Sequence, residues 1–143
     1  MQIAGITKKM ANVIDNSGQV LQALYWQTQA ALEACGQQAV SHAKKNITQA
    51  SRVDTGAMRN SITHKVVASE YACYVGTNIE YGIYNELGTG IYAEGGRGRK
   101  TPWTYVDAKG EGHRTVGMKP IHFLKNAIQD NKSEYEQIIK QEL

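Results

Sequence analysis

Histidines are the side chains in this sequence best suited to acid–base or metal chemistry, because an unperturbed imidazole titrates near neutral pH. They stand at positions 42, 64, 113 and 122, with no HxH, HExxH or cysteine–histidine cluster at metal-ligand spacing. Ser41 and Ser61 have histidines nearby in sequence, but neither lies in a nucleophile elbow with an orienting carboxylate. We therefore predict no catalytic, cofactor-binding or metal-binding residues and interpret the imidazoles as surface or half-buried groups.

Residues 88–112 hold seven of the fourteen glycines and few aliphatic side chains. A phosphate-binding loop needs its glycines between a strand and a helix, with a lysine and a hydroxyl behind them. The run "GTGIYAEGGRGRK" matches neither the P-loop spacing nor the dinucleotide-binding spacing. It is followed by Pro102 and Trp103 and not by a helix. Long irregular segments in compact domains are usually functional or ordered by a partner. We expect an extended loop or β-hairpin arm, closed by the later "TYVD", that takes its shape from a neighbouring subunit.

The same segment combines cations with aromatic rings, the pairing that single-stranded nucleic acid binders use. The residues are Arg97, Arg99, Lys100, Tyr92, Trp103 and Tyr105. Glu94 and Asp107 dilute the charge, and the net charge of the whole chain is only +3. A nucleic-acid-binding module using residues 92–105 stays open as the alternative function.

Aromatic residues concentrate in one part of the chain, since seven of the eleven fall between residues 71 and 105. Tyr and Trp carry a large apolar face and a polar edge and are enriched where protein surfaces meet. This distribution favours an assembly surface over a catalytic site.

The 143 residues, 41% hydrophobic and 20% charged, predict one compact domain over residues 1–143. Cys35 and Cys73 lie in apolar patterns, as reduced, buried thiols do in cytosolic proteins. The first residues lack the apolar core of a signal peptide, and we expect no membrane contact.

Apolar residues recur at helical spacing from Ser17 to about Ala50, with Asn16 or Ser17 as a candidate cap. Such a helix is roughly 50 Å long at 1.5 Å per residue, whereas a domain of this size is about 37 Å across. The helix must therefore either kink, with Gly36 as the candidate position, or extend beyond the domain.

The remaining pattern predicts two strands, at residues 61–68 and 71–77, with a turn at 69–70. A short helix follows at 78–88, capped by Asn78 and stopped by Gly88. A strand at 113–119 and a single helix started by Pro120 complete the chain. The predicted fold is α+β, with a long N-terminal helix and a C-terminal helix packed on a small, mostly antiparallel sheet.

Four separated motifs of the sequence are "VDTGAMRNSI", "YVGTNIEYGIYNELGTG", "PW.Y.D" and "TVGMKPIHFLKNAI". Together they resemble a family of small tailed-bacteriophage proteins, described as tail-component, tail-completion or neck proteins of the head-to-tail joining region. Leu87 departs from the aromatic common in the family, and residues 51–53 lack its frequent proline. The structural motif positions carried over by this resemblance are Asp54, Thr55, Gly56, Arg59, Gly76, Thr77, Gly88, Thr89, Pro120, Phe123 and Leu124.

The resemblance implies a structural virion protein in the phage neck or tail, assembled in the host cytoplasm. Six copies would form a ring between a head connector or stopper protein and a tail terminator or tail tube protein, and DNA would pass through without sequence-specific binding. Its role as connector, stopper, completion factor or terminator stays open. The residues expected at subunit contacts are Tyr81, Tyr84, Glu86, Tyr92, Arg97, Arg99, Trp103 and Tyr105.

Overall fold

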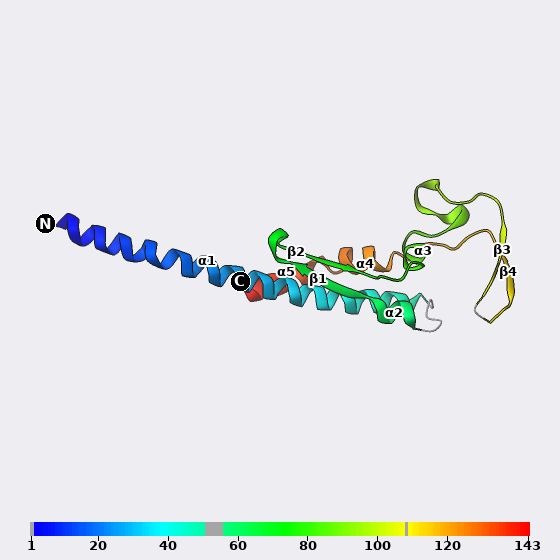
Figure 1. Ribbon diagram of the computed structural model, residues 1–143, viewed down its shortest axis with the longest axis horizontal. Coiled ribbons are helices and arrows are strands. Elements are labelled where there is room, and N and C mark those ends of the chain that lie inside the picture. The colour runs from blue at the N-terminus through cyan, green and yellow to red at the C-terminus, as the bar shows by residue number, and fades with distance from the viewer. Residues whose placement is uncertain (1, 51–55, 108) are drawn as a thin grey trace.

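The computed structural model describes residues 2–50, 56–107 and 109–143, with side chains from residue 16 onward. It is an α+β fold, as predicted, and its elements are arranged along one very long helix (Figure 1). The strands form two separate two-stranded antiparallel sheets in this part of the chain, where the sequence predicted one sheet.

The long helix, α1 (Gln2–Gln49), begins well before the predicted start at Ser17. The sequence of α1 contains no proline, and the polar pair Asn16–Ser17 alone does not interrupt the helix. Asn16 and Ser17 lie within α1 and are not its N-cap. The prediction that the helix extends beyond the domain is confirmed, because the body of the protein covers only its second half (Figure 1).

A kink at Gly36 was the wrong alternative, since α1 continues through this residue. A Cβ atom at Gly36 would lie 2.6 Å from both Cys73 Sγ and His64 Cδ2. The glycine therefore allows the first hairpin to pack directly on the helix backbone.

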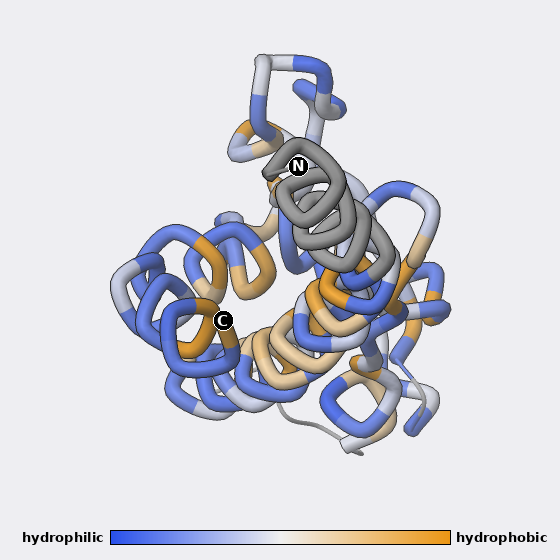
Figure 2. The backbone as a smooth tube through the Cα atoms, turned by 90° about the vertical axis from the view of Figure 1, so that its left-hand side faces the viewer, coloured by the Kyte–Doolittle hydropathy of each residue, from blue (hydrophilic) through white to orange (hydrophobic). Residues whose placement is uncertain are grey.

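The first hairpin joins β1 (Thr63–Val67) to β2 (Ala72–Gly76) through a 3₁₀ turn at Ala68–Glu70. The register pairs Thr63 with Gly76 and Val67 with Ala72, close to the predicted strands and turn. Both strands contact α1, whereas α4 (Phe123–Gln129) and α5 (Lys132–Glu142) contact it elsewhere. Figure 2 looks along the long axis and shows hydrophobic segments mostly on the sides of the helices that face one another.

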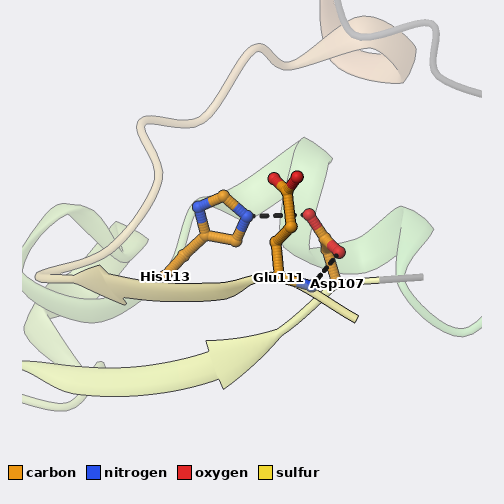
Figure 3. Close-up of side chains that lie close together, drawn as sticks. All are labelled: Asp107, Glu111 and His113. Carbon is orange, nitrogen blue, oxygen red and sulfur yellow. Dashed lines mark hydrogen bonds and ion pairs between the residues drawn. The ribbon is translucent and has the colours of Figure 1, made fainter. Parts of the chain in front are cut away.

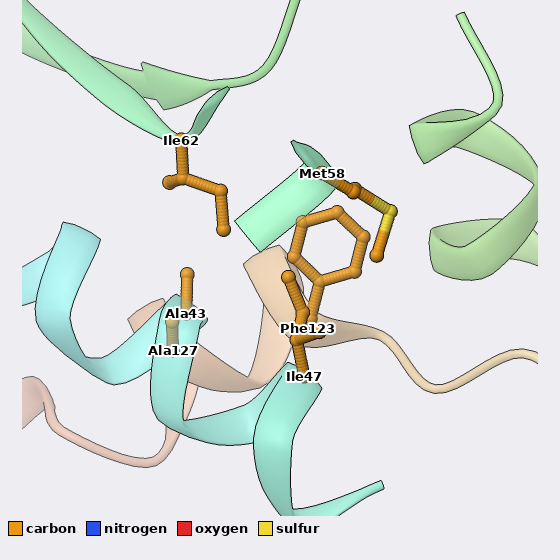
Figure 4. Close-up of a cluster of buried hydrophobic side chains, with 6 residues drawn as sticks. All are labelled: Ala43, Ile47, Met58, Ile62, Phe123 and Ala127. Atoms are coloured by element: carbon orange, nitrogen blue, oxygen red, sulfur yellow. The ribbon is translucent and has the colours of Figure 1, made fainter. Parts of the chain in front are cut away.

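The core lies where α1, α4 and the short helix α2 (Ala57–Ser61) meet (Figure 4). Phe123 and Ile47 are its largest fully buried side chains. The other members are alanines and medium-sized apolar residues, namely Ala43, Met58, Ile62 and Ala127. Alanines at the helix contacts let the backbones approach closely, which explains the small residues on this face of α1.

The C-terminal region forms two helices, which corrects the single helix predicted from Pro120. Pro120 precedes α4, and the N-cap residue of this helix is His122, with φ of 49°. Asn131 has non-helical dihedrals, and its side-chain amide donates to the carbonyl of Ala127, so the polar Asp130–Asn131 step ends α4. The Tyr135 hydroxyl donates to the same carbonyl at 2.6 Å, and burial raises the pKa of Tyr135 to about 12.

The predicted short helix is α3 (Gly82–Leu87), which begins after Tyr81 and not at Asn78. It ends at Gly88, whose φ of 79° confirms the predicted glycine stop. Beyond it, β3 (Trp103–Val106) pairs with β4 (Gly112–Thr115) in a second hairpin. The "TYVD" run thus pairs with the strand that follows it and not with the glycine-rich segment before it.

Candidate assembly surface

An open groove of about 1200 Å³ is formed by α3, the glycine-rich segment and the second hairpin. We call it the aromatic groove. Its aromatic walls are Tyr81, Tyr84, Trp103 and Tyr105. Its size exceeds the roughly 300–1,000 Å³ of ordinary small-molecule pockets, and it suits a protein segment better than a metabolite.

The groove depends on a crossing between two segments that are distant in sequence. The amide of Thr89 donates to the carbonyl of Met118 at 2.9 Å, and the amide of Met118 donates to the Thr89 hydroxyl at 2.9 Å. A Cβ on Gly90 would lie 1.9 Å from the carbonyl oxygen of Val116, so only glycine fits this crossing. The Gly-Thr-Gly sequence is therefore explained by close backbone contact, without any phosphate ligand.

The glycine-rich segment has a defined path within the subunit, contrary to the expectation that it lacks a shape of its own. It forms 3₁₀ turns at Gly90–Tyr92 and Glu94–Gly96. The segment then folds back, because a Cβ on Gly98 would lie 2.0 Å from the carbonyl oxygen of Gly90. Sequence composition alone could not reveal this contact between two glycines eight residues apart.

Two of the three cations in residues 92–105 are engaged within the subunit. The guanidinium carbon of Arg99 lies 5.5 Å from the ring centroid of Trp103, and its Nε donates to the Thr101 hydroxyl at 3.2 Å. Lys100 donates from Nζ to the carbonyl of Gly96 at 2.9 Å. These contacts reduce the availability of Arg99 and Lys100 to nucleic acid phosphates.

Six of the eight residues expected at subunit contacts line the aromatic groove: Tyr81, Tyr84, Arg97, Arg99, Trp103 and Tyr105. The other two have partners elsewhere in the subunit. The ammonium nitrogen of Lys119 lies 5.6 Å from the ring centroid of Tyr92. The Glu86 carboxylate accepts hydrogen bonds from the first amides of α4, at Leu124 and Lys125. A role at subunit contacts stays a prediction for all eight.

Sequence reasoning missed the aliphatic part of the groove, which comprises Ile83, Leu87 and Met118. Ile83 and Leu87 fall in the short helix predicted at 78–88, and the structure leaves both exposed. Asn85 is buried on the same helix, where its side chain donates to the carbonyl of Tyr81 at 3.3 Å. A polar residue on the inner side of α3 turns the apolar side outward, a reversal that helical periodicity cannot show.

The remaining motif residues have structural positions. Gly56 adopts φ of 81° before α2, and Arg59 donates to the hydroxyl of Thr48 at 3.3 Å. Gly76 ends β2, and the hydroxyls of Ser61 and Thr77 form a hydrogen bond. A Cβ on Gly88 would lie 2.8 Å from Pro120 Cδ, so two of the sequence motifs meet here. Asp54 and Thr55 lie outside the described residues.

The turn of the second hairpin brings together Asp107, Glu111 and His113, whose potential ligand atoms lie within 4.8 Å of one another (Figure 3). Asp107 accepts hydrogen bonds from the amides of Lys109 and Glu111, each at 2.9 Å, and from His113 Nε2 at 2.8 Å. The His113 contact is the main reason that the pKa of Asp107 is lowered. Sequence reasoning did not single out this cluster, and these hydrogen bonds explain it as the closure of the turn.

Two more histidines join elements of the body through carboxylates. His42 on α1 contacts Glu134 on α5 at 2.8 Å, and His64 on β1 contacts Glu33 on α1 at 2.7 Å. Cys35 and Cys73 are free thiols, half-buried where burial was expected, and burial raises the pKa of both. Contacts between helices and strands thus explain the positions of these two histidines and two cysteines.

A second exposed apolar surface lies on α1, before the body begins to cover this helix. The exposed fractions are 57% for Val20, 67% for Leu21, 44% for Leu24 and 62% for Trp26. Tyr25 marks the edge of the body, because its ring meets Tyr71 of the first hairpin edge-on at 6.3 Å. The residues whose side chains are described thus include exposed apolar regions on α1 and in the aromatic groove.

These features define an α+β protein built on one long helix, with its most apolar surfaces open to a partner. Residues 8–88 match the family model HK97-gp10_like, described as "Bacteriophage HK97-gp10, putative tail-component". The match covers more than half of the chain, and the chain belongs to this family of phage tail components, a structural class of virion protein. The family resemblance inferred from the motifs is confirmed.

No curated protein and no solved structure matches the chain. Among the described residues, no helix is both long and apolar enough to span a membrane.

Proposed function

We propose that this protein is a structural subunit of a ring in the phage neck, where it joins the head connector to the tail or completes the tail. Membership of a tail-component family supports a place in the virion and contacts with other virion proteins. The ring, its copy number of six and its position in the neck are the further steps of the proposal. Six copies would match the symmetry expected of the tail.

The observation that carries the proposal is the pair of exposed apolar surfaces on one subunit. A cyclic ring needs a heterologous interface, in which one patch meets a different patch on the next copy. The aromatic groove and the exposed part of α1 are two such patches, and they differ in shape. One is concave and the other is a convex helix.

The proposal assigns no catalytic step to the protein. The described histidine–carboxylate pairs each bridge two elements or close a turn. In this account the described ionisable groups serve folding, and function resides in the exposed apolar surfaces.

Deletion of the gene from the phage tests the role. Accumulation of complete heads and separate tails of normal length would support head-to-tail joining. Tails of abnormal length would assign the protein to termination, and normal infectious particles would overturn the proposal. Complementation with the wild-type gene is the control.

Nucleic-acid binding through residues 92–105 is the alternative, because Arg97 and Arg99 line the groove beside Trp103 and Tyr105. The internal contacts of Arg99 and Lys100 weigh against it. Measured affinity for single-stranded DNA decides between the two functions.

A further inference from the structure

Three of the four exposed apolar residues of α1, namely Val20, Leu21 and Leu24, form a stripe in line with the buried face of the same helix, whereas Trp26 lies on the opposite side. Successive helical residues turn by about 100°, so Val20, Leu21 and Leu24 fall within about 100° of one another. The stripe continues as Ala31 and Ala39, which are buried by the body. The packing pattern of α1 thus extends past the last element of its own subunit, as in a helix with a second partner.

The composition of this region restricts the chemistry of that partner. No charged residue occurs between Asp15 and Glu33. A helix that binds nucleic acid phosphates or lies on a membrane surface carries Lys or Arg along its polar face. The stretch therefore favours apolar contact with a protein over binding to phosphates or to a membrane surface.

Pairing between two copies of this helix is the competing occupant, because Ile3, Ile6, Met10 and Val13 precede Val20 and Leu24 at heptad spacing in the sequence. A coiled coil would use this whole repeat, whereas a groove takes a few anchors at positions i, i+1 and i+4. Val20, Leu21 and Leu24 provide such anchors, and their exposure ends where the body covers the helix. Crosslinks to α1 or to the groove of another copy distinguish the two.

The chain itself provides such a groove at its opposite end. Figure 1 shows α1 extending from one end of the molecule, with α3 and the second hairpin at the other. Ile83, Leu87 and Met118 give the aromatic groove an aliphatic wall that matches the aliphatic stripe. Because the two surfaces lie far apart, a subunit cannot satisfy both within itself, whereas a chain of subunits can.

We propose that the aromatic groove of each subunit receives the stripe formed by Val20, Leu21 and Leu24 from the next copy of this chain. The inference rests on the proposed ring and names the segment that its interface uses. Apolar contact supplies the affinity, and the exposed aromatic edges of the groove supply polar contacts to the helix. The interface is heterologous, so each copy contributes one stripe and one groove.

Photo-crosslinking in assembled particles tests this contact. A phage carrying Leu24→p-benzoylphenylalanine is irradiated, and crosslinked peptides are mapped by mass spectrometry. Gln22, exposed on the opposite face of α1, is the matched control position. Mixed isotope labelling distinguishes crosslinks between copies from those within one. We expect crosslinks from position 24 to the groove of another copy, and none there from position 22.

Crosslinks from position 24 only to α1 of another copy, only to a different virion protein, or to nothing would overturn the inference. The proposed ring would still stand if the particles retain a ring of this protein. Absence of the wild-type protein from particles would instead overturn the proposed function, so the two failures are distinguishable.

Two variants that introduce opposite charges on the two sides of the contact provide an independent test. Leu24→Glu should cause a loss of plaque-forming titre, whereas Gln22→Glu should not. Adding Ile83→Lys to Leu24→Glu should restore titre, because the two charges would meet across the contact. Both residues are exposed, so unchanged unfolding curves of the purified variants exclude misfolding. No loss with Leu24→Glu, or a loss without rescue, would contradict the contact.

Discussion

The carboxylate of Glu86 lies 2.8 Å from the backbone nitrogen of Leu124 and 2.9 Å from that of Lys125, at the start of α4. A carboxylate at this position satisfies amides without a helical partner and opposes the positive end of the helix dipole. This interaction joins α3 to α4, which in turn packs on α1. It connects the groove-forming helix to the core.

Glu86→Gln should lower the free energy of unfolding by about 1 kcal/mol, in the range for loss of a helix-capping group. The amide keeps the size of the side chain but has no charge and only one acceptor oxygen. Urea unfolding measures the change. Glu94→Gln is the control, because Glu94 is exposed at the groove, and its change should be negligible. Equal stabilities for the two variants would contradict the capping role.

Gly36→Ala should destabilise the protein by about 1–3 kcal/mol, the usual cost of overpacking. The new methyl group would lie 2.6 Å from Cys73 Sγ and His64 Cδ2 and would displace the first hairpin. Gly18→Ala is a matched control on the same helix, with nothing within 4 Å of its added Cβ.

The control should leave stability unchanged or raise it by up to about 1 kcal/mol, because alanine favours helix over glycine. Urea unfolding monitored by circular dichroism compares the two variants. A similar response from both would show that Gly36 does not serve close packing.

Acid should loosen the turn of the second hairpin before the rest of the fold. The pKa of Asp107 is lowered by its hydrogen bond with His113 and by the amides of Glu111 and Lys109. Its contribution is therefore fully present above the pKa of an unfolded Asp, about 3.9, and is lost as pH falls through the lower folded value. The affected window lies below about pH 4.

Amide chemical shifts of Lys109 and Glu111, followed by NMR from pH 6 to 2, measure this transition. Asp107→Asn should remove the low-pH step at these amides while leaving those of β1 and β2 unchanged. A turn whose amide shifts titrate identically in the variant would contradict the assignment.

Single-stranded DNA should bind weakly or not at all, even at low salt. Arg99 stacks on Trp103 and Lys100 is bound to a carbonyl, so two of the three cations in residues 92–105 are already engaged. Fluorescence anisotropy with an oligonucleotide measures the affinity. Tight binding that falls steeply with salt and weakens in Arg97→Ala would favour the alternative function instead.

Local sequence patterns predicted the type and order of the helices and strands better than the residues at which they begin and end. The apolar repeat of α1 was visible, and arithmetic on its length predicted that it would extend past the body. Its early start was missed because Asn16 and Ser17 resemble a cap, yet a polar pair alone does not stop a helix. The C-terminal break at Asn131 was missed for the converse reason, since the apolar repeat continues roughly across it.

Sequence patterns could not predict the features of the candidate site that depend on contacts between residues distant in the chain. Four of the seven aromatic residues between 71 and 105 line the aromatic groove, as do six of the eight residues expected at subunit contacts, whose role there stays a prediction. The internal roles of Gly36 and Glu86 depend on partners at positions 64, 73 and 124, which no local pattern specifies. The aliphatic wall of the groove could not be predicted either, because its exposure follows from the burial of Asn85 on the other side of α3.

Electron microscopy of the intact particle tests the central claim most directly. The account predicts six copies of this protein in a ring at the neck, with Trp103 and Tyr84 of every copy covered by the next subunit. A map in which the protein forms no ring, or in which the aromatic groove of every copy faces solvent, would contradict it.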